Sequence, residues 1–221
     1  MSELFETINN KGRLKQLVYR NTLDSINLVK KVLTDLRNEY MKIYSRDSQA
    51  IPFIQTDMGE FEVRLQFAGD VLIFSMHTNV FEFSRYHEVM STEYIRADKT
   101  RSYCGIINIY NFLADSFKYD RVNDVGYLIG RVFINKDKCY FIDGKREVGL
   151  LYNNFGQEVF DEAAARKLVE SAVLYTINFD LLTPPFDAVK EISLTEMKSI
   201  GESYTLKTGK RLGFKFQADK D

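Results

Sequence analysis

The longest uninterrupted pattern in this chain is a helical stripe in its N-terminal fifth, and it restricts the fold more than any other feature. Residues 13–44 contain no proline, and mostly apolar side chains recur there at alternating steps of three and four. That spacing places them on one side of an α-helix of about eight turns. The stripe consists of Tyr19, Thr22, Ile26, Val29, Leu33, Leu36, Tyr40 and Ile43.

A helix of this length needs a surface on which to bury its stripe. We expect the N-terminal segment, residues 1–45, to pack on a sheet, because most apolar stripes face a core. The alternative is that the stripe pairs with a second copy as a dimerising coil. Gly12 is predicted to separate the long helix from a short one at residues 4–8.

The periodicity changes from helix to strand after Ile51. Residues 61–67, FEVRLQF, alternate between apolar and polar side chains, as in an antiparallel strand with one face in solvent. In residues 71–83, VLIFSMHTNVFEF, Thr78-Asn79 is predicted to be a two-residue hairpin loop that sets Met76 opposite Phe81. Residues 102–113 and 125–135 are apolar on both sides, which predicts central strands covered on both faces.

Together these elements predict an α+β fold, with a single antiparallel sheet of about six to eight strands. The long N-terminal helix and a second helix near residues 161–177, capped by Asp161, are expected to flank that sheet. Asp143-Gly144 is a predicted turn into a further strand, and residues 203–216 are predicted to form a terminal basic hairpin. No internal repeat or long linker is present, so residues 1–221 are expected to form one domain.

Composition and motifs limit the functions that this chain can have. Thirty basic residues nearly balance thirty-one acidic ones, so no overall charge attracts nucleic acid or membrane. The N-terminus lacks the pattern of a signal peptide, and Cys104 and Cys139 are too few for a disulfide framework, which together predict a cytoplasmic protein with reduced thiols. The familiar nucleotide-binding, metalloprotease and hydrolase motifs are missing.

Two weaker patterns could indicate a metal or catalytic site. His77 and His87 fall on opposite faces of the predicted hairpin, so they do not converge as metal ligands. Asp124, Asp143 and Lys145 resemble the acid-and-lysine core of restriction-type nucleases. Residues 135–138 are predicted to form a tight turn that sets Asp143 opposite Gly130. Asp124 then lies six strand residues, or about 20 Å, further along, too far for the two acids to share a metal ion. The sequence therefore predicts no catalytic residues, no metal ligands and no cofactor.

Two sets of residues are candidates for binding. Arg131 lies mid-strand, where the strand alternation places Tyr127 on the same face, and the pair could anchor an anion in an aromatic pocket. The structural alternative is an arginine that is paired or reaches solvent at the sheet edge. In the terminal hairpin, Lys207, Arg211 and Lys215 share one face, either as a polyanion site or as a solvated edge.

The leading hypothesis for function is a non-catalytic cytoplasmic binding or assembly module. Its expected partner is a protein, or a second copy of the chain bound through the N-terminal helix, and no membrane partner is expected. Two alternatives stay open. One is a small-molecule sensor or enzyme with an aromatic pocket around Arg131, and the other is a nucleic-acid binder that uses the basic C-terminal hairpin.

Overall fold

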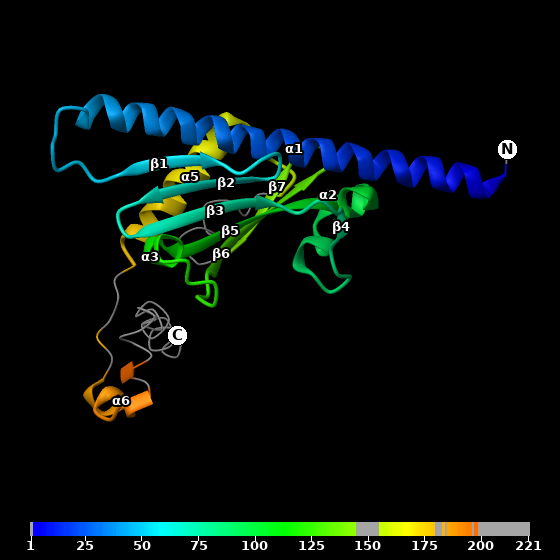
Figure 1. Ribbon diagram of the computed structural model, residues 1–221. Coiled ribbons are helices and arrows are strands. Elements are labelled where there is room, and N and C mark those ends of the chain that lie inside the picture. The colour runs from blue at the N-terminus through cyan, green and yellow to red at the C-terminus, as the bar shows by residue number, and fades with distance from the viewer. Residues whose placement is uncertain (1, 145–154, 180–182, 184, 196, 199–221) are drawn as a thin grey trace.

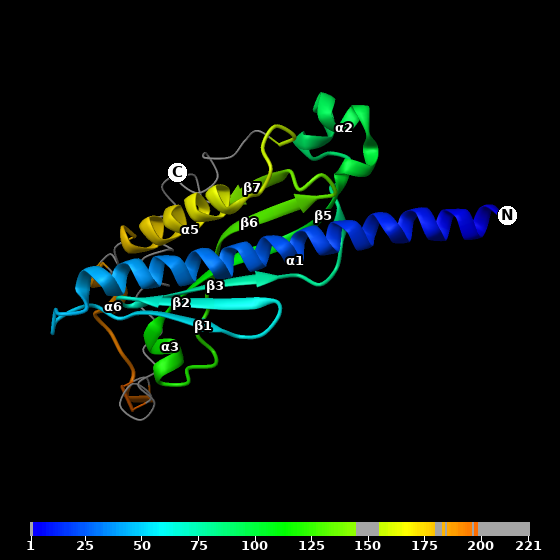
Figure 2. The same ribbon diagram turned by 90° about the horizontal axis from the view of Figure 1, so that it is seen from above.

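The computed structural model describes residues 2–144, 155–179, 183, 185–195, 197 and 198. It confirms the α+β class, because a seven-stranded antiparallel sheet carries helices α1 and α5 on one face (Figure 1, Figure 2). The strands pair in the order β1-β2-β3-β5-β6-β7, and β4 also pairs with β5. The strands are β1 (Phe53–Asp57), β2 (Glu62–Phe67), β3 (Asp70–Met76), β4 (Phe81–Glu82), β5 (Tyr103–Leu113), β6 (Tyr127–Asn135) and β7 (Tyr140–Gly144). The helices are α1 (Glu3–Tyr44), η1 (Glu88–Ser91), α2 (Glu93–Ala97), η2 (Lys99–Ser102), α3 (Ala114–Lys118), α5 (Glu162–Ile177) and α6 (Phe186–Val189).

Helix α1 is continuous from Glu3 to Tyr44, so the predicted break at Gly12 is wrong. A glycine weakens a helix by only about 1 kcal/mol relative to alanine, and the strong helix formers of residues 13–17 outweigh it. The side chain of Ser2 caps the first turn by accepting a hydrogen bond from the backbone N–H of Phe5.

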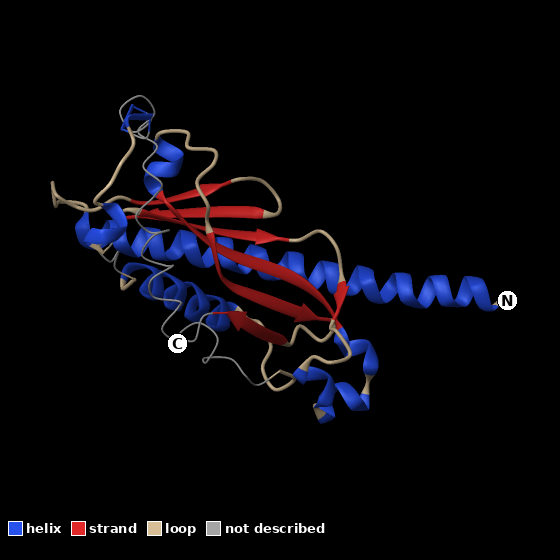
Figure 3. Cartoon of the chain, turned by 90° about the horizontal axis from the view of Figure 1, so that it is seen from below, coloured by secondary structure: helices blue, strands red, loops and turns tan. Residues whose placement is uncertain are grey.

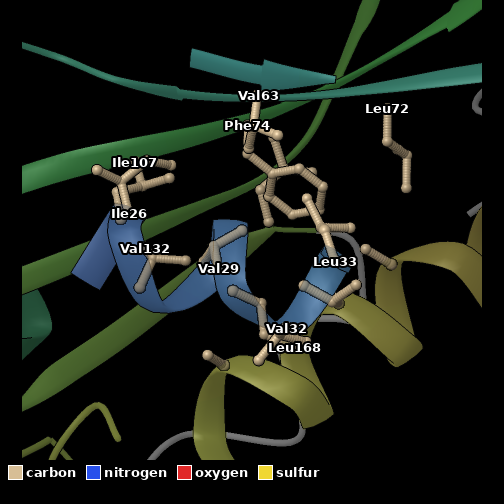
Figure 4. Packing of buried hydrophobic residues seen from close by; sticks show 14 of the residues in the cluster. Ile26, Val29, Val32, Leu33, Val63, Leu72, Phe74, Ile107, Val132 and Leu168 are labelled. Carbon is tan, nitrogen blue, oxygen red and sulfur yellow. The ribbon is translucent and has the colours of Figure 1, made fainter. Parts of the chain in front are cut away.

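The main core lies between the helices and the sheet (Figure 4). The middle of α1 supplies Ile26, Val29, Val32 and Leu33, all buried, which confirms that this part of the predicted stripe faces the sheet. The alternating strand behaves as predicted, since Val63, Leu65 and Phe67 of β2 are buried in the same cluster. Helix α5 begins at its predicted cap, where Asp161 Oδ1 accepts the N–H of Ala164 at 2.8 Å, and it buries Leu168 and Val169 beside α1.

The opposite face of the sheet is covered at one end, where a second cluster packs, and no described helix crosses its middle (Figure 3). Strand β5 is central as predicted, but Ile106, Asn108 and Tyr110 on this second face are only half-buried. Within the described ranges, the cover of this second face is therefore partial in the middle of β5. The second cluster contains Phe83, Val89, Ile95, Cys104, Phe133, Cys139, Phe141 and Phe155, so both thiols are free and buried.

The predicted hairpin at Thr78-Asn79 does not form. Strand β3 pairs with β5 from Asp70↔Leu113 to Met76↔Ile107, and β4 continues along the same strand with Phe81↔Cys104. Residues 77–80 therefore bulge out of one edge without reversing the chain. His77 stabilises the bulge, because its Nδ1 accepts the N–H of Asn79 at 3.0 Å and its own N–H donates to Ile106 O.

Candidate functional site

The side chain of Arg131 pairs with a residue of the neighbouring strand β7 rather than lining a pocket. The β6–β7 connection places Lys138 at a φ of 60°, so the turn contains one residue more than the tight loop that the sequence suggested. The extra residue shifts the register of β6 against β7 by one, so Asp143 pairs with Arg131 instead of with Gly130. The two side chains form an ion pair, each more than 40% exposed, and the guanidinium lies 5.3 Å from the centre of the Phe133 ring.

Tyr127 is not brought to the face of Arg131. The pairing of β5 with β6 shifts between Ile109 and Tyr110, so that Asn108 pairs with Arg131 and Asn111 pairs with Tyr127. Positions 108 and 111 are three apart along β5 and point to opposite faces. The predicted aromatic pocket around Arg131 therefore loses Tyr127, because a β-bulge reverses the alternation between them.

Asp143-Gly144 belongs to β7 and is paired with Arg131 and Gly130, so the predicted turn at this dipeptide is wrong. The strand expected after it lies outside the described residues. The terminal hairpin, with Lys207, Arg211 and Lys215, also lies outside them and stays a prediction.

The acids and histidines that suggested catalysis have separate structural partners. Asp124 accepts a hydrogen bond from Ser116 Oγ at 2.6 Å, while Asp143 is paired with Arg131. His87 Nδ1 caps η1 by accepting the N–H of Val89 at 3.3 Å, and its ring packs on Phe83. Across the described ranges, no three potential metal ligands among His, Cys, Asp and Glu come together.

A polar network at one end of the sheet was not found from the sequence. Tyr94 Oη donates to Asp137 Oδ2 at 2.8 Å and accepts from Asn135 Nδ2 at 2.9 Å, while Arg101 stacks over the Tyr94 ring and also contacts Asp137. Burial, followed by contact with Cys139, raises the pKa of Tyr94 well above its ordinary value. These groups satisfy one another, so the network fastens the 84–102 segment to the β6–β7 turn and leaves no open site.

The first turns of α1 extend beyond the sheet (Figure 2). A 42-residue helix is about 63 Å long, whereas an 11-residue strand such as β5 spans about 36 Å. The first buried residue of α1 is Val18. We call residues 3–17 the arm. Leu4, Phe5 and Ile8 lie near its tip and are 63, 64 and 59% exposed.

A groove lies where the arm meets the body of the protein. One wall is formed by Lys15, Gln16, Tyr19 and Arg20 of α1, and the other by residues 78–81, from the bulge and the start of β4. The groove is open to solvent, with a volume of about 710 Å³. Within the described residues, neither Lys15 nor Arg20 forms a salt bridge or side-chain hydrogen bond, so both cations are available.

The exposed tip and the groove belong to one surface, which we call the arm surface. Leu4, Ile8, Gly12, Lys15 and Tyr19 follow one another at steps of four, four, three and four. Residues at this spacing share one side of a helix. The arm surface thus begins with apolar side chains, passes Gly12, and ends in a groove with aromatic and basic walls.

The other end of α1 borders a smaller apolar groove. It has a volume of about 350 Å³ and is lined by Leu36, Tyr40 and Ile43 of α1 together with Phe53, Val173 and Leu174. Arg166 bridges Glu39 and Glu170 beside it, so α1 and α5 are held together there by ion pairs. This groove is therefore part of the packing between two helices of the same chain.

Comparison adds no functional assignment. Within the described residues, none of the helices combines the length and the apolar composition that crossing a membrane requires. Comparisons with protein-family models, with curated proteins and with solved structures each return no match, so the function has to be argued from the geometry of the arm surface.

Proposed function

We propose that this chain is a non-catalytic, cytoplasmic binding or assembly module that holds a protein partner on the arm surface. The observation that carries the proposal is the exposure of Leu4, Phe5 and Ile8 within two turns of a helix that runs past its own sheet. Single exposed apolar residues are ordinary in globular proteins, but neighbouring ones on one element mark interaction surfaces.

The size of the exposed group is sufficient for a specific contact. Complete burial of a Leu, Ile or Phe side chain contributes about 1.5–3 kcal/mol, so burying the exposed parts of these three contributes on the order of 3–5 kcal/mol. The helix is already formed and capped at Ser2, so less conformational entropy is lost on binding than for a disordered peptide. A partner helix laid along the arm would meet apolar side chains at the usual spacing.

Other observations support the cytoplasmic and non-catalytic parts of the proposal. Cys104 and Cys139 are buried and unpaired, which suits a reducing compartment. Arg131 has Asp143 as its partner and Tyr127 on the other face, which weakens the case for a sensor or enzyme built around them. The nucleic-acid alternative depends on Lys207, Arg211 and Lys215 and stays open as a prediction.

A photo-crosslinking residue placed on the arm tests the proposal. One variant carries it at Ile8, on the arm surface, and a matched control carries it at Arg13, which is five residues on and about 140° around the helix. We expect irradiation in cells to give a discrete protein adduct from position 8 alone, which the purified partner then reproduces. The proposal fails if both positions give the same adducts, or if neither gives any while the variants remain folded.

A further inference from the structure

We propose that the occupant of the arm surface is a second copy of this chain, bound antiparallel so that the tip of each arm lies in the groove of the other. This inference rests on the proposed function and specifies its partner. Each molecule has an uncovered apolar tip and, separately, an open groove. The tip carries unburied apolar side chains, Leu4, Phe5 and Ile8, and the groove offers Tyr19 and Phe81 as an aromatic lining.

The tip and the groove of one chain cannot meet. The tip and the α1 wall of the groove lie on the same continuous α-helix, which extends from Glu3 to Tyr44 without a break, and a helix cannot fold back upon itself. In a pair of chains, the tip of each molecule can lie in the groove of the other, since each molecule has one tip and one groove. The contact is then isologous, which is the arrangement of a twofold dimer.

Charge favours the antiparallel orientation. Before Asp24 the only acids are Glu3 and Glu6, both at the tip, and the cations Lys11, Arg13, Lys15 and Arg20 all lie behind them. An antiparallel pair centred on residue 12 sets residue 4 of one chain opposite residue 20 of the other, so Glu3 and Glu6 of each tip lie beside Arg20 of the partner copy. Lys11, Arg13 and Lys15 lie around the crossing. A parallel pair would set the tips side by side and the basic segments side by side, and like charges would repel.

Gly12 fixes the register. If Phe5 of one chain lies at Tyr19 of the other, the midpoint of the contact is residue 12, and the two glycines meet at the crossing. Among the residues that the structure describes, no atom would lie within 4 Å of a Cβ at this position, so no contact within this part of the molecule requires glycine there. Glycine in a helix interior is unfavourable relative to alanine, whereas a close crossing of two helices benefits from a small residue.

The groove has room for the tip. Its volume of about 710 Å³ lies between α1 and residues 78–81, and it is open to solvent. Phe81 at its far wall is 37% exposed, and Tyr19 is half-buried against Phe61 at a ring separation of 6.5 Å. An incoming Phe5 would place a third aromatic ring beside Tyr19 and Phe81 in the lining of the groove.

Sedimentation equilibrium of the purified full-length chain tests the inference. We expect a concentration-dependent dimer whose dissociation constant rises at least about tenfold in Gly12→Leu, since a large side chain would separate the crossing helices. Asn10→Leu is the matched control, because it adds a similar side chain on the other side of the arm and should leave the dimer unchanged. Circular dichroism should show both variants equally folded, because a Cβ at position 12 meets no neighbour.

Oxidative crosslinking tests the register. Gly12→Cys should form a disulfide-linked dimer readily, because residue 12 meets its own copy at the twofold axis, whereas Ile8→Cys should not. Efficient linkage through position 8 would indicate a parallel pair and overturn the inference. A chain that stays monomeric at every concentration, or a dimer that Gly12→Leu does not weaken, would also overturn it. In that case a crosslink from position 8 to a different protein would leave the proposed function standing.

Discussion

Truncating Leu33 measures how much of the stability comes from packing α1 on the sheet. Leu33 is fully buried in the main core, and Figure 4 shows it between α1, the sheet and α5 near Phe74. Leu33→Ala removes three carbons, which lowers the free energy of unfolding by about 2.4 kcal/mol through lost transfer alone. The cavity left behind adds to this, so we expect a total loss of about 3–4 kcal/mol.

The matched control is Ile8→Ala, which truncates an aliphatic side chain of the same helix at a position that is 59% exposed. In dilute protein, where association contributes little, this change should alter the free energy of unfolding by less than about 0.5 kcal/mol. For a chain of this size, the loss at Leu33 corresponds to a melting temperature lower by about 6–16 °C.

Urea and thermal unfolding followed by circular dichroism would give both values. The urea slope should stay the same, because the surface exposed on unfolding hardly changes. An unchanged melting temperature for Leu33→Ala would refute the packing of α1 on the sheet. An equal loss in Ile8→Ala would show instead that the arm is buried within a single chain.

Three further changes test other parts of the structure. Gly105→Ala should lower the free energy of unfolding by about 1–3 kcal/mol, because its Cβ would lie 2.0 Å from Thr22 Oγ1. Adding Thr22→Ala should recover part of that loss in urea titrations, and a neutral Gly105→Ala would contradict this close approach. Arg131→Met should change stability by less than about 1 kcal/mol, since its ion pair with Asp143 is more than 40% exposed, and a larger loss in the same titration would contradict this assignment. Burial raises the pKa of the Cys104 thiol to about 12, so a thiol reagent at neutral pH should label it far more slowly in the native than in the unfolded protein. The unfolded thiol ionises near its ordinary pKa of 9.0 while the native thiol stays protonated, so stability should fall as pH rises from about 9 to 12, and this fall should be smaller in Cys104→Ala. Rapid labelling of the native protein would contradict the burial of this thiol.

The sequence by itself determined the elements whose signals are local. The period of the stripe through Ile26, Val29 and Leu33 predicted a helix and its buried side, and the alternation of residues 61–67 predicted β2 and its buried side. Asp161 predicted the start of α5 to the residue. Such features depend on which neighbours a side chain has within a turn or along a strand, and that information is complete in the sequence.

The tertiary structure decided which strands pair and in which register. Thr78-Asn79 has the composition of a hairpin loop, yet β5 is long enough to pair with β3 and β4 in succession, so the chain passes straight on. Lys138 adopts a left-handed conformation in the β6–β7 turn, and the resulting strand register pairs Arg131 with Asp143. A single bulge in β5–β6 pairing then turned Tyr127 away from Arg131.

For the arm surface, too, the sequence determined one part and the tertiary structure the other. The sequence contains Leu4, Ile8 and Gly12 at helical spacing, but such a stripe is the same whether it faces a core or solvent. Only the fold shows that the sheet ends before the arm does, so the apolar tip has no cover from the described part of its own chain. Strand pairing and cover depend on contacts between residues far apart in sequence, and a shift of one residue reverses every side chain that follows.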